Sequence, residues 1–262
     1  MKIDVLKKND NEIQFLVEGI KPSFASALRR IMMSEIPTMA VEWVEFKKND
    51  SALNDEVVAN RLGLVPLTFD PKAYNVNATC EKCKGKGCSR CQVKLVLKKK
   101  GPAVVYSKDL KSTAKDVKPA FDNIPITELF EGQDIEFEAT AQLGFGKDHV
   151  KWQGAVVGYK NKANVIVPKD LEAKKEYIQS CPVDVFEAHG SKIVAERPMD
   201  CILCMQCVEA SNGKIKIEAV EDSFIFNVET ASGLTADEVV STAAEILGSK
   251  MGEFGKAVKK VK

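Results

Sequence analysis

All eight cysteines of this chain fall into two groups of four, so its fold is expected to bring together two sets of candidate metal ligands. The first group has the spacing C-x₂-C-x₄-C-x₂-C, and the second joins a Cys-Pro pair to a later C-x₂-C-x₂-C run. The candidate ligands are Cys80, Cys83, Cys88 and Cys91 in the first group and Cys181, Cys201, Cys204 and Cys207 in the second. In a reducing compartment, such clustering favours metal ligation over disulfide formation.

The second group has the pattern of an iron–sulfur site. A C-x₂-C-x₂-C curl points three thiolates inward, and bacterial-type ferredoxins take their fourth ligand from a distant Cys-Pro. Cys181-Pro182 supplies that ligand here. We predict one [4Fe–4S] cluster, with [3Fe–4S] left open by the spacing, and with Zn²⁺ as a weaker alternative because four thiolates also suit zinc.

The ligands of a second ferredoxin cluster are missing. The positions that would carry them hold Leu171, Lys174, Tyr177 and Ser211. A single cluster has no internal partner with which to exchange electrons, so a structural or redox-sensing role is favoured over electron transfer.

The first group predicts a structural zinc site. Its two C-x₂-C knuckles close a tetrahedral set of thiolates, and Gly85 and Gly87 supply backbone angles that such a short loop needs. Four basic residues, Lys82, Lys84, Lys86 and Arg90, offset the negative charge of the thiolates. A second iron–sulfur cluster is the first alternative, and a redox-labile loop without a stable metal is the second.

Apolar helices are predicted near both ends of the chain. Within residues 23–42, Phe24, Leu28, Ile31 and Met32 recur at helical spacing, and Pro37 ends the helix before a strand. Thr235 and Glu238 have capping-box spacing. A long seam follows them at steps of four and three, formed by Val240, Ala244, Leu247, Met251, Phe254 and Val258. Gly248, Gly252 and Gly255 beside it indicate either close backbone approach or fraying.

The middle of the chain is predicted to be mainly β. Alternating residues predict strands at 93–97 and 135–140, after a strand pair within 3–17, a strand at 41–46 and an apolar turn at 60–67. Residues 165–167 are predicted to form a buried strand, and residues 169–179 are predicted to form a charged helix. Two further strands are expected at 214–220 and 223–229, before the last helix.

Composition argues against several function classes. The 38 basic and 37 acidic residues nearly cancel, so the chain has no overall field for nucleic acid or membrane. No apolar run reaches the roughly 18 residues that span a bilayer, and a cytoplasmic location without membrane contact is expected. There is no phosphate-binding loop, serine elbow or acidic magnesium cluster, so we expect no active site in this chain.

Three long motifs resemble those of one family. They are SFASALRRIMMSEIPTMAVE at residues 23–42, NRLGLVPL at 60–67 and LGFGKDHVKWQGA at 143–155. The chain resembles the archaeal RNA polymerase D subunits, counterparts of the bacterial alpha N-terminal region and the eukaryotic third subunit. The likeness covers essentially the whole chain, and four cysteines, at 181, 201, 204 and 207, match the cluster ligands of that family.

The resemblance implies an α+β fold with a discontinuous dimerisation domain of sheet plus helices, an inserted mainly-β domain and an inserted ferredoxin-like iron–sulfur domain. The implied division is dimerisation domain 1–46, β domain 47–160, return strand 161–168, cluster domain 169–221 and dimerisation domain 222–262. It also implies a non-catalytic assembly subunit that pairs with subunit L and then joins subunits N and P and the large catalytic subunits, with little direct nucleic-acid contact. The chain would belong to an enzyme only as part of that polymerase.

Two other functions stay open on sequence grounds. A ferredoxin-like electron carrier or redox-enzyme subunit would use the same cluster, provided that a partner supplied the missing relay site. A free-standing nucleic-acid-binding zinc protein is a weaker hypothesis because the overall charge is balanced.

Overall fold

The computed structural model describes residues 1–260, and these divide into two compact units, each of which draws on distant parts of the sequence. The first contains residues 1–8, 13–29 and 158–227, and the second contains 9–12, 30–157 and 228–260. The units are described separately below.

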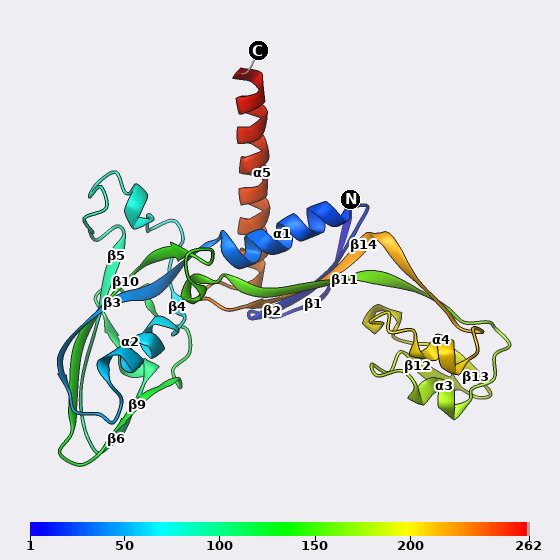
Figure 1. The fold of residues 1–262 in the computed structure, drawn as a ribbon, viewed down its shortest axis with the longest axis horizontal. Coiled ribbons are helices and arrows are strands. Elements are labelled where there is room, and N and C mark those ends of the chain that lie inside the picture. The colour runs from blue at the N-terminus through cyan, green and yellow to red at the C-terminus, as the bar shows by residue number, and fades with distance from the viewer. Residues whose placement is uncertain (261–262) are drawn as a thin grey trace. The chain divides into compact units, whose positions relative to one another are not determined.

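The first unit is organised on a four-stranded sheet in the order β1-β2-β14-β11 (Figure 1). Its strands are β1 (Lys2–Lys8), β2 (Glu12–Glu18), β11 (Ala155–Ile166) and β14 (Lys216–Thr230). The rings of Phe15 and Phe226 stack with centroids 5.1 Å apart, and Tyr159 meets Phe226 at 5.4 Å. These aromatic contacts join strands β2, β11 and β14, which are far apart in the sequence. The two strands expected at 214–220 and 223–229 form one continuous strand, β14.

Between β11 and β14 the first unit carries a small segment of short elements around a separate core. These are α3 (Lys175–Gln179), β12 (Phe186–His189), β13 (Lys192–Ala195), the 3₁₀ turn η4 (Pro198–Asp200) and α4 (Gln206–Ala210). The charged helix expected over 169–179 is therefore only its last five residues. Gly190 makes the turn between β12 and β13 with a φ of +65°, a conformation that glycine adopts without strain.

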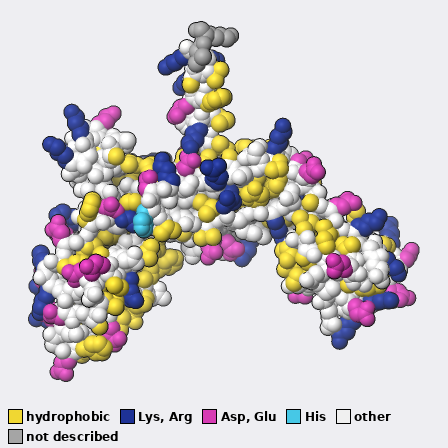
Figure 2. Space-filling model, in the orientation of Figure 1, with side chains coloured by type: hydrophobic (Ala, Val, Ile, Leu, Met, Phe, Trp, Pro, Cys, Tyr) yellow, Lys and Arg dark blue, Asp and Glu magenta, His cyan; other side chains and the backbone are white. Residues whose placement is uncertain are grey.

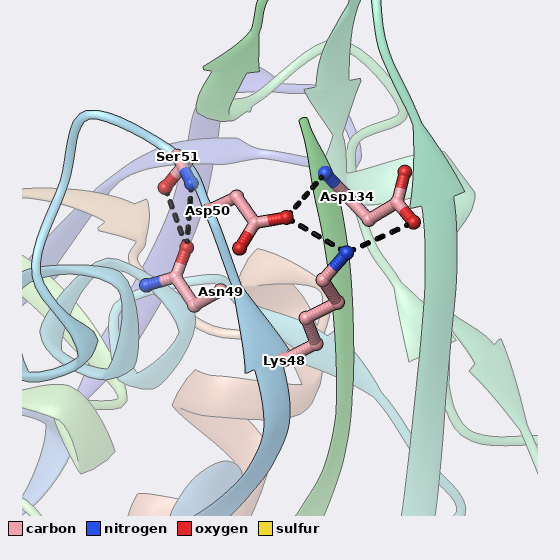
Figure 3. Close-up of polar contacts among 5 residues, drawn as sticks. All are labelled: Lys48, Asn49, Asp50, Ser51 and Asp134. Atoms are coloured by element: carbon pink, nitrogen blue, oxygen red, sulfur yellow. Dashed lines mark hydrogen bonds and ion pairs between the residues drawn. The ribbon is translucent and has the colours of Figure 1, made fainter. Parts of the chain in front are cut away.

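The second unit contains a sheet in the order β3-β10-β5-β7. Its strands are β3 (Pro37–Asn49), β5 (Gln92–Lys100), β7 (Lys111–Ser112) and β10 (Asp134–Phe145). Leu95, Phe137 and Ala139 are fully or almost fully buried on one face. At the end of β3, Lys48 bridges the carboxylates of Asp50 (2.9 Å) and Asp134 (3.2 Å), as Figure 3 shows.

Shorter elements complete the second unit. They are α2 (Asp55–Gly63), the pairs β4 (Leu67–Thr68) with β8 (Lys118–Pro119) and β6 (Ala103–Tyr106) with β9 (Pro125–Leu129), and the 3₁₀ turns η1 (Asn77–Thr79), η2 (Ser107–Asp109) and η3 (Val150–Trp152). The turn predicted at 60–67 is thus partly helical. Val58 and Leu62, one helical turn apart, are both fully buried on the inner face of α2.

Helices α1 (Pro22–Ser34) and α5 (Ala236–Lys260) lie near the two ends of the chain, as predicted. Leu28, Ile31 and Met32 are buried, whereas Phe24 is 38% exposed. Helix α1 begins one residue before the expected cap, with Pro22 in its first turn, where the missing backbone N–H is not needed.

The expected mixture of α-helices and β-strands is confirmed in its coarse form, with several small sheets and few helices. In the described part of the chain, no helix combines the length and the apolar character needed to cross a membrane.

Candidate metal centres and exposed helix

The N-terminus of α5 forms half of the predicted capping box. The backbone N–H of Thr235 donates to the Glu238 carboxylate at 2.8 Å, and the Thr235 hydroxyl donates to the same oxygen at 2.9 Å. Glu238 therefore satisfies a backbone donor at the helix start, and its charge also favours the positive end of the helix dipole.

Only the first turns of α5 are packed. Ala236, Val239 and Ala243 are fully buried, but every described residue from 248 onward is exposed. The predicted seam continues along this exposed part, where Met251, Phe254 and Val258 leave 60%, 65% and 53% of their surface open. Figure 2 shows hydrophobic side chains along this helix. We call these three residues the α5 stripe.

The glycines beside the α5 stripe also face open space. A Cβ placed on Gly248, Gly252 or Gly255 would meet no atom within 4 Å. Lys250, on the same stretch, pairs with Glu35, just after α1. That ion pair lies where the packed part of α5 gives way to the exposed part.

The motif at residues 143–155 is used for close packing within the second unit. A Cβ on Gly144 would come within 2.3 Å of the Trp152 ring, and one on Gly146 within 2.4 Å of the Met33 carbonyl oxygen. The Trp152 indole N–H donates to the Gln142 carbonyl at 3.2 Å. Glycine is therefore required for this segment to lie against the end of α1.

The first cysteine group forms a compact set of four sulfurs. All four lie within 4.8 Å of one another, and the Sγ–Sγ separations are 3.8 Å for Cys80–Cys88, 3.5 Å for Cys83–Cys91 and 3.6 Å for Cys88–Cys91. Sulfurs about 2.3 Å from a tetrahedral Zn²⁺ are about 3.8 Å apart. The side chains therefore already have the spacing of ligands around a single ion.

The backbone of this loop makes the expected tight turns. Lys84, Gly85 and Gly87 have φ values of +51°, +85° and +88°. The Cys88 N–H donates to the Cys91 sulfur at 3.2 Å. In the metal-free loop, the pKa values of two of the thiols are shifted in opposite directions. Desolvation raises the pKa of Cys83, but hydrogen bonds, mainly from neighbouring thiols, outweigh it and lower that pKa to about 7. Desolvation raises the pKa of Cys91 to about 12.

The second cysteine group lies at the edge of a hydrophobic core in the first unit. Cys181, Cys201 and Cys207 are buried together with Val185 and Phe186, while Cys204 is exposed. Burial raises the pKa of Cys207, and the charges of the other three cysteines raise it further. Cys207 therefore lies within electrostatic range of the other three thiols. Among the described residues, however, only the first group brings its ligand atoms within 4.8 Å.

Three of the four positions of the missing ferredoxin ligands hold buried side chains, and the fourth, Lys174, is exposed. Leu171 and Tyr177 belong to the same core, and Ser211 is completely buried. The Ser211 hydroxyl donates to the Val208 carbonyl at 3.2 Å and accepts the Ile215 N–H at 3.0 Å.

Sequence reasoning missed several side chains around both centres. Burial lowers the pKa of Lys160, which faces the opposing charges of Asp200 and Cys201. At the first group, the amide of Asn77 lies against two sulfurs and also contacts Gln142, 65 residues away in sequence. No local pattern marks residues that act across such separations.

Comparison with known proteins finds one family and a set of relatives that match nearly the whole chain. The family model for the RNA polymerase Rpb3/Rpb11 dimerisation domain matches residues 14–251. The chain is 40% identical to the Thermococcus kodakarensis protein named DNA-directed RNA polymerase subunit Rpo3, over 97% of this chain and 96% of that one. It is 38% identical to the protein of that name from Methanosarcina acetivorans, over 97% of each, and 37% identical to the one from Archaeoglobus fulgidus, over 99% and 98%.

These matches cover both compact units and agree with the resemblance found in the sequence motifs. The chain belongs to the RNA polymerase Rpb3/Rpb11 dimerisation family and is related over its full length to the archaeal Rpo3 subunits.

Proposed function

We propose that this chain is a non-catalytic assembly subunit of archaeal DNA-directed RNA polymerase. It pairs with the small subunit L, and the pair forms a platform for subunits N and P and for the two large catalytic subunits. The α5 stripe is the observation that carries the proposal, because its seam runs from the packed turns of the helix into a stretch whose apolar side chains no described residue covers. The chain contributes to nucleotidyl transfer only as part of that complex.

The chemistry of the stripe fits a helical partner. Side chains at steps of three and four lie on one face of a helix, which is the arrangement used in lengthwise helix packing. Exposed apolar side chains in such a row mark protein-interaction surfaces. The open glycines next to the stripe leave room for a partner backbone to approach closely.

The test of pairing is native mass spectrometry of the purified chain mixed with the L subunit of the same organism. A 1:1 complex is expected at micromolar concentration. A chain that stays monomeric in the presence of L would contradict the proposal. Assembly with the large subunits but without L would place the first interface elsewhere.

The domain division inferred from the sequence remains part of this proposal. Residues 1–46, 161–168 and 222–262 would form the dimerisation domain, 47–160 the inserted β domain and 169–221 the cluster domain. The separate core around Tyr177, Val185 and Phe186 supports the last of these.

Zinc is the metal that best fits the first group. Its sulfur separations match one tetrahedral ion, whereas in a cubane cluster each thiolate binds a different iron and the sulfurs are held farther apart. Zn²⁺ would be held by Cys80, Cys83, Cys88 and Cys91 and would fix the loop against β5. Its role would be structural, because all four positions are filled by protein ligands.

A [4Fe–4S] cluster on Cys181, Cys201, Cys204 and Cys207 is proposed for the second group. The wider spread of these thiols and their position around a hydrophobic core support a cluster larger than one ion. When bound, the cluster would join Cys181 to the 201–207 loop and so stabilise residues 169–221. We assign it a structural role in assembly.

Elemental analysis of anaerobically purified protein tests both assignments. One zinc, four irons and four sulfides per chain are expected. Three irons would indicate the [3Fe–4S] form, and eight irons without zinc would assign a cluster to the first group. Serine at both Cys201 and Cys204 should remove the iron, preserve the pair with L and weaken assembly with the large subunits. Loss of the pair itself would refute the structural role proposed for the cluster.

A further inference from the structure

The side chain of Asn77 lies directly against the first cysteine group. Its Oδ1 accepts hydrogen bonds from the Cys91 thiol at 3.4 Å and from the Cys83 thiol at 3.7 Å. Asn77 stands at the start of η1, and its backbone carbonyl also accepts the Cys80 N–H at 3.2 Å. One residue thus contacts three of the four proposed ligands.

These two thiol bonds exist only while the sulfurs carry hydrogen. Metal-bound cysteines are thiolates, which accept hydrogen bonds but have none to donate. A carbonyl oxygen left facing two thiolates would be repelled by them. The other end of the same amide, Nδ2, carries two hydrogens and has nearly the same shape. Reversal of the amide would therefore give each thiolate one donor.

The side-chain amides of two further residues determine whether the Asn77 amide can turn its Nδ2 toward the sulfurs. Asn77 Nδ2 donates to Gln142 Oε1 at 3.3 Å, and Gln92 Nε2 donates to the same oxygen at 3.2 Å. Gln142 and Gln92 are directly opposite one another on β10 and β5. If all three amides reverse together, Gln142 donates through Nε2 to Asn77 Oδ1 and to Gln92 Oε1. The two hydrogen bonds among these three amides are then kept, each with donor and acceptor exchanged.

We propose that Asn77 is the hydrogen-bond donor to the metal-bound thiolates of Cys83 and Cys91, and that Gln142 and Gln92 hold its amide in that orientation. This inference rests on the proposed metal site. Asn77 is a positioning residue that stabilises the charge on the sulfurs without binding the metal. Through these three amides, metal binding in the cysteine loop is coupled to the orientation of side chains on strands β5 and β10.

The proposal predicts different effects on metal affinity for two substitutions of equal charge. A glutamate at 142 accepts from Asn77 and Gln92, as in the metal-free arrangement, but cannot donate to Asn77. A glutamate at 92 accepts from Gln142, as the metal-bound arrangement requires. Gln142→Glu should therefore weaken metal binding, while Gln92→Glu should leave it unchanged or strengthen it.

The measurement is the Zn²⁺ affinity of the full chain at pH 7.5, determined by competition with a chromophoric chelator, together with the absorption spectrum of the Co²⁺ form. Loss of a hydrogen bond to a metal ligand typically lowers affinity by about 10- to 100-fold. We expect that loss for Asn77→Asp and Gln142→Glu, with a shifted Co²⁺–thiolate band. Asn75→Asp is the matched control, because Asn75 is exposed in the same loop, and it should change the affinity less than about threefold.

The melting temperature of the metal-free chain separates weaker metal binding from a general loss of stability. Gln142→Glu preserves the hydrogen bonds of the metal-free arrangement and should therefore leave this temperature unchanged. Equal affinities for the Gln142→Glu and Gln92→Glu chains would overturn the inference. If the unaltered chain binds neither Zn²⁺ nor Co²⁺ through these sulfurs, the proposed zinc site fails instead.

Discussion

Replacing two residues of the α5 stripe tests the proposed interface. We consider Met251→Ser combined with Phe254→Ser. Complete burial of a Met or Phe side chain contributes about 1.5–3 kcal/mol. With 60% and 65% of their surfaces still open in the free chain, burial against a partner should add about 1–2 kcal/mol for each residue.

The pair of substitutions should therefore remove about 2–4 kcal/mol of binding free energy, which raises Kd for subunit L roughly 30- to 1,000-fold. Isothermal titration calorimetry of the purified chain with L measures this directly. The melting temperature of the free chain should hardly change, because neither side chain is buried within it.

Helix propensity provides the necessary control. Serine costs an exposed helix about 0.5 kcal/mol relative to alanine, so the effect of fraying has to be separated from the loss of contact with L. Lys256→Ser introduces the same residue on the opposite face of α5 and should change Kd less than about threefold. A double variant that binds L as tightly as the unaltered chain would refute the assignment of the stripe as the interface.

Three further predictions concern the cysteine centres and the core beside them. In the metal-free protein, alkylation by iodoacetamide should rise as the pH increases through about 7 and should modify Cys83 before Cys91, because the pKa is lowered to about 7 for Cys83 and raised to about 12 for Cys91. Peptide mass mapping at several pH values checks this order. Preferential modification of Cys91 would refute it. Ser211→Ala leaves the buried Ile215 N–H without its acceptor and should lower the free energy of unfolding by about 1–3 kcal/mol in urea denaturation, whereas an unchanged midpoint would show that the hydroxyl is dispensable. Cys204→Ser should lower the iron content of the protein without changing its affinity for L; retention of all four irons would remove Cys204 from the ligand set.

Local sequence signals predicted the terminal helices well. The apolar stripe of α1 and the stop at Pro37 depend on residues within a few positions of one another, as does the cap formed by Thr235 and Glu238. Helix α2 was missed because only nine residues form it and because Gly63 and Pro66 indicated a turn. Local patterns therefore located the two long helices but missed the short helices α2 and α4.

Long-range pairing could not be predicted from local patterns. Strand β3 pairs with β10 along its whole length, although the paired residues, from Asn49 with Ile135 to Pro37 with Phe145, are far apart in sequence. The cysteine spacings predict two ligand sets, because ligand spacing is largely a local property, and the structure brings the four sulfurs of the first set within 4.8 Å of one another. The amides of Asn77, Gln92 and Gln142 meet only after β5 and β10 have paired, so no motif indicates them.

The central claim is that this chain assembles a polymerase without performing its chemistry. The most direct measurement is reconstitution of the archaeal polymerase from its purified subunits with this chain left out, followed by native mass spectrometry and a transcription assay. We predict that the large subunits fail to join the platform and that activity returns when the chain is added. A complete and active polymerase formed without this chain would contradict the claim.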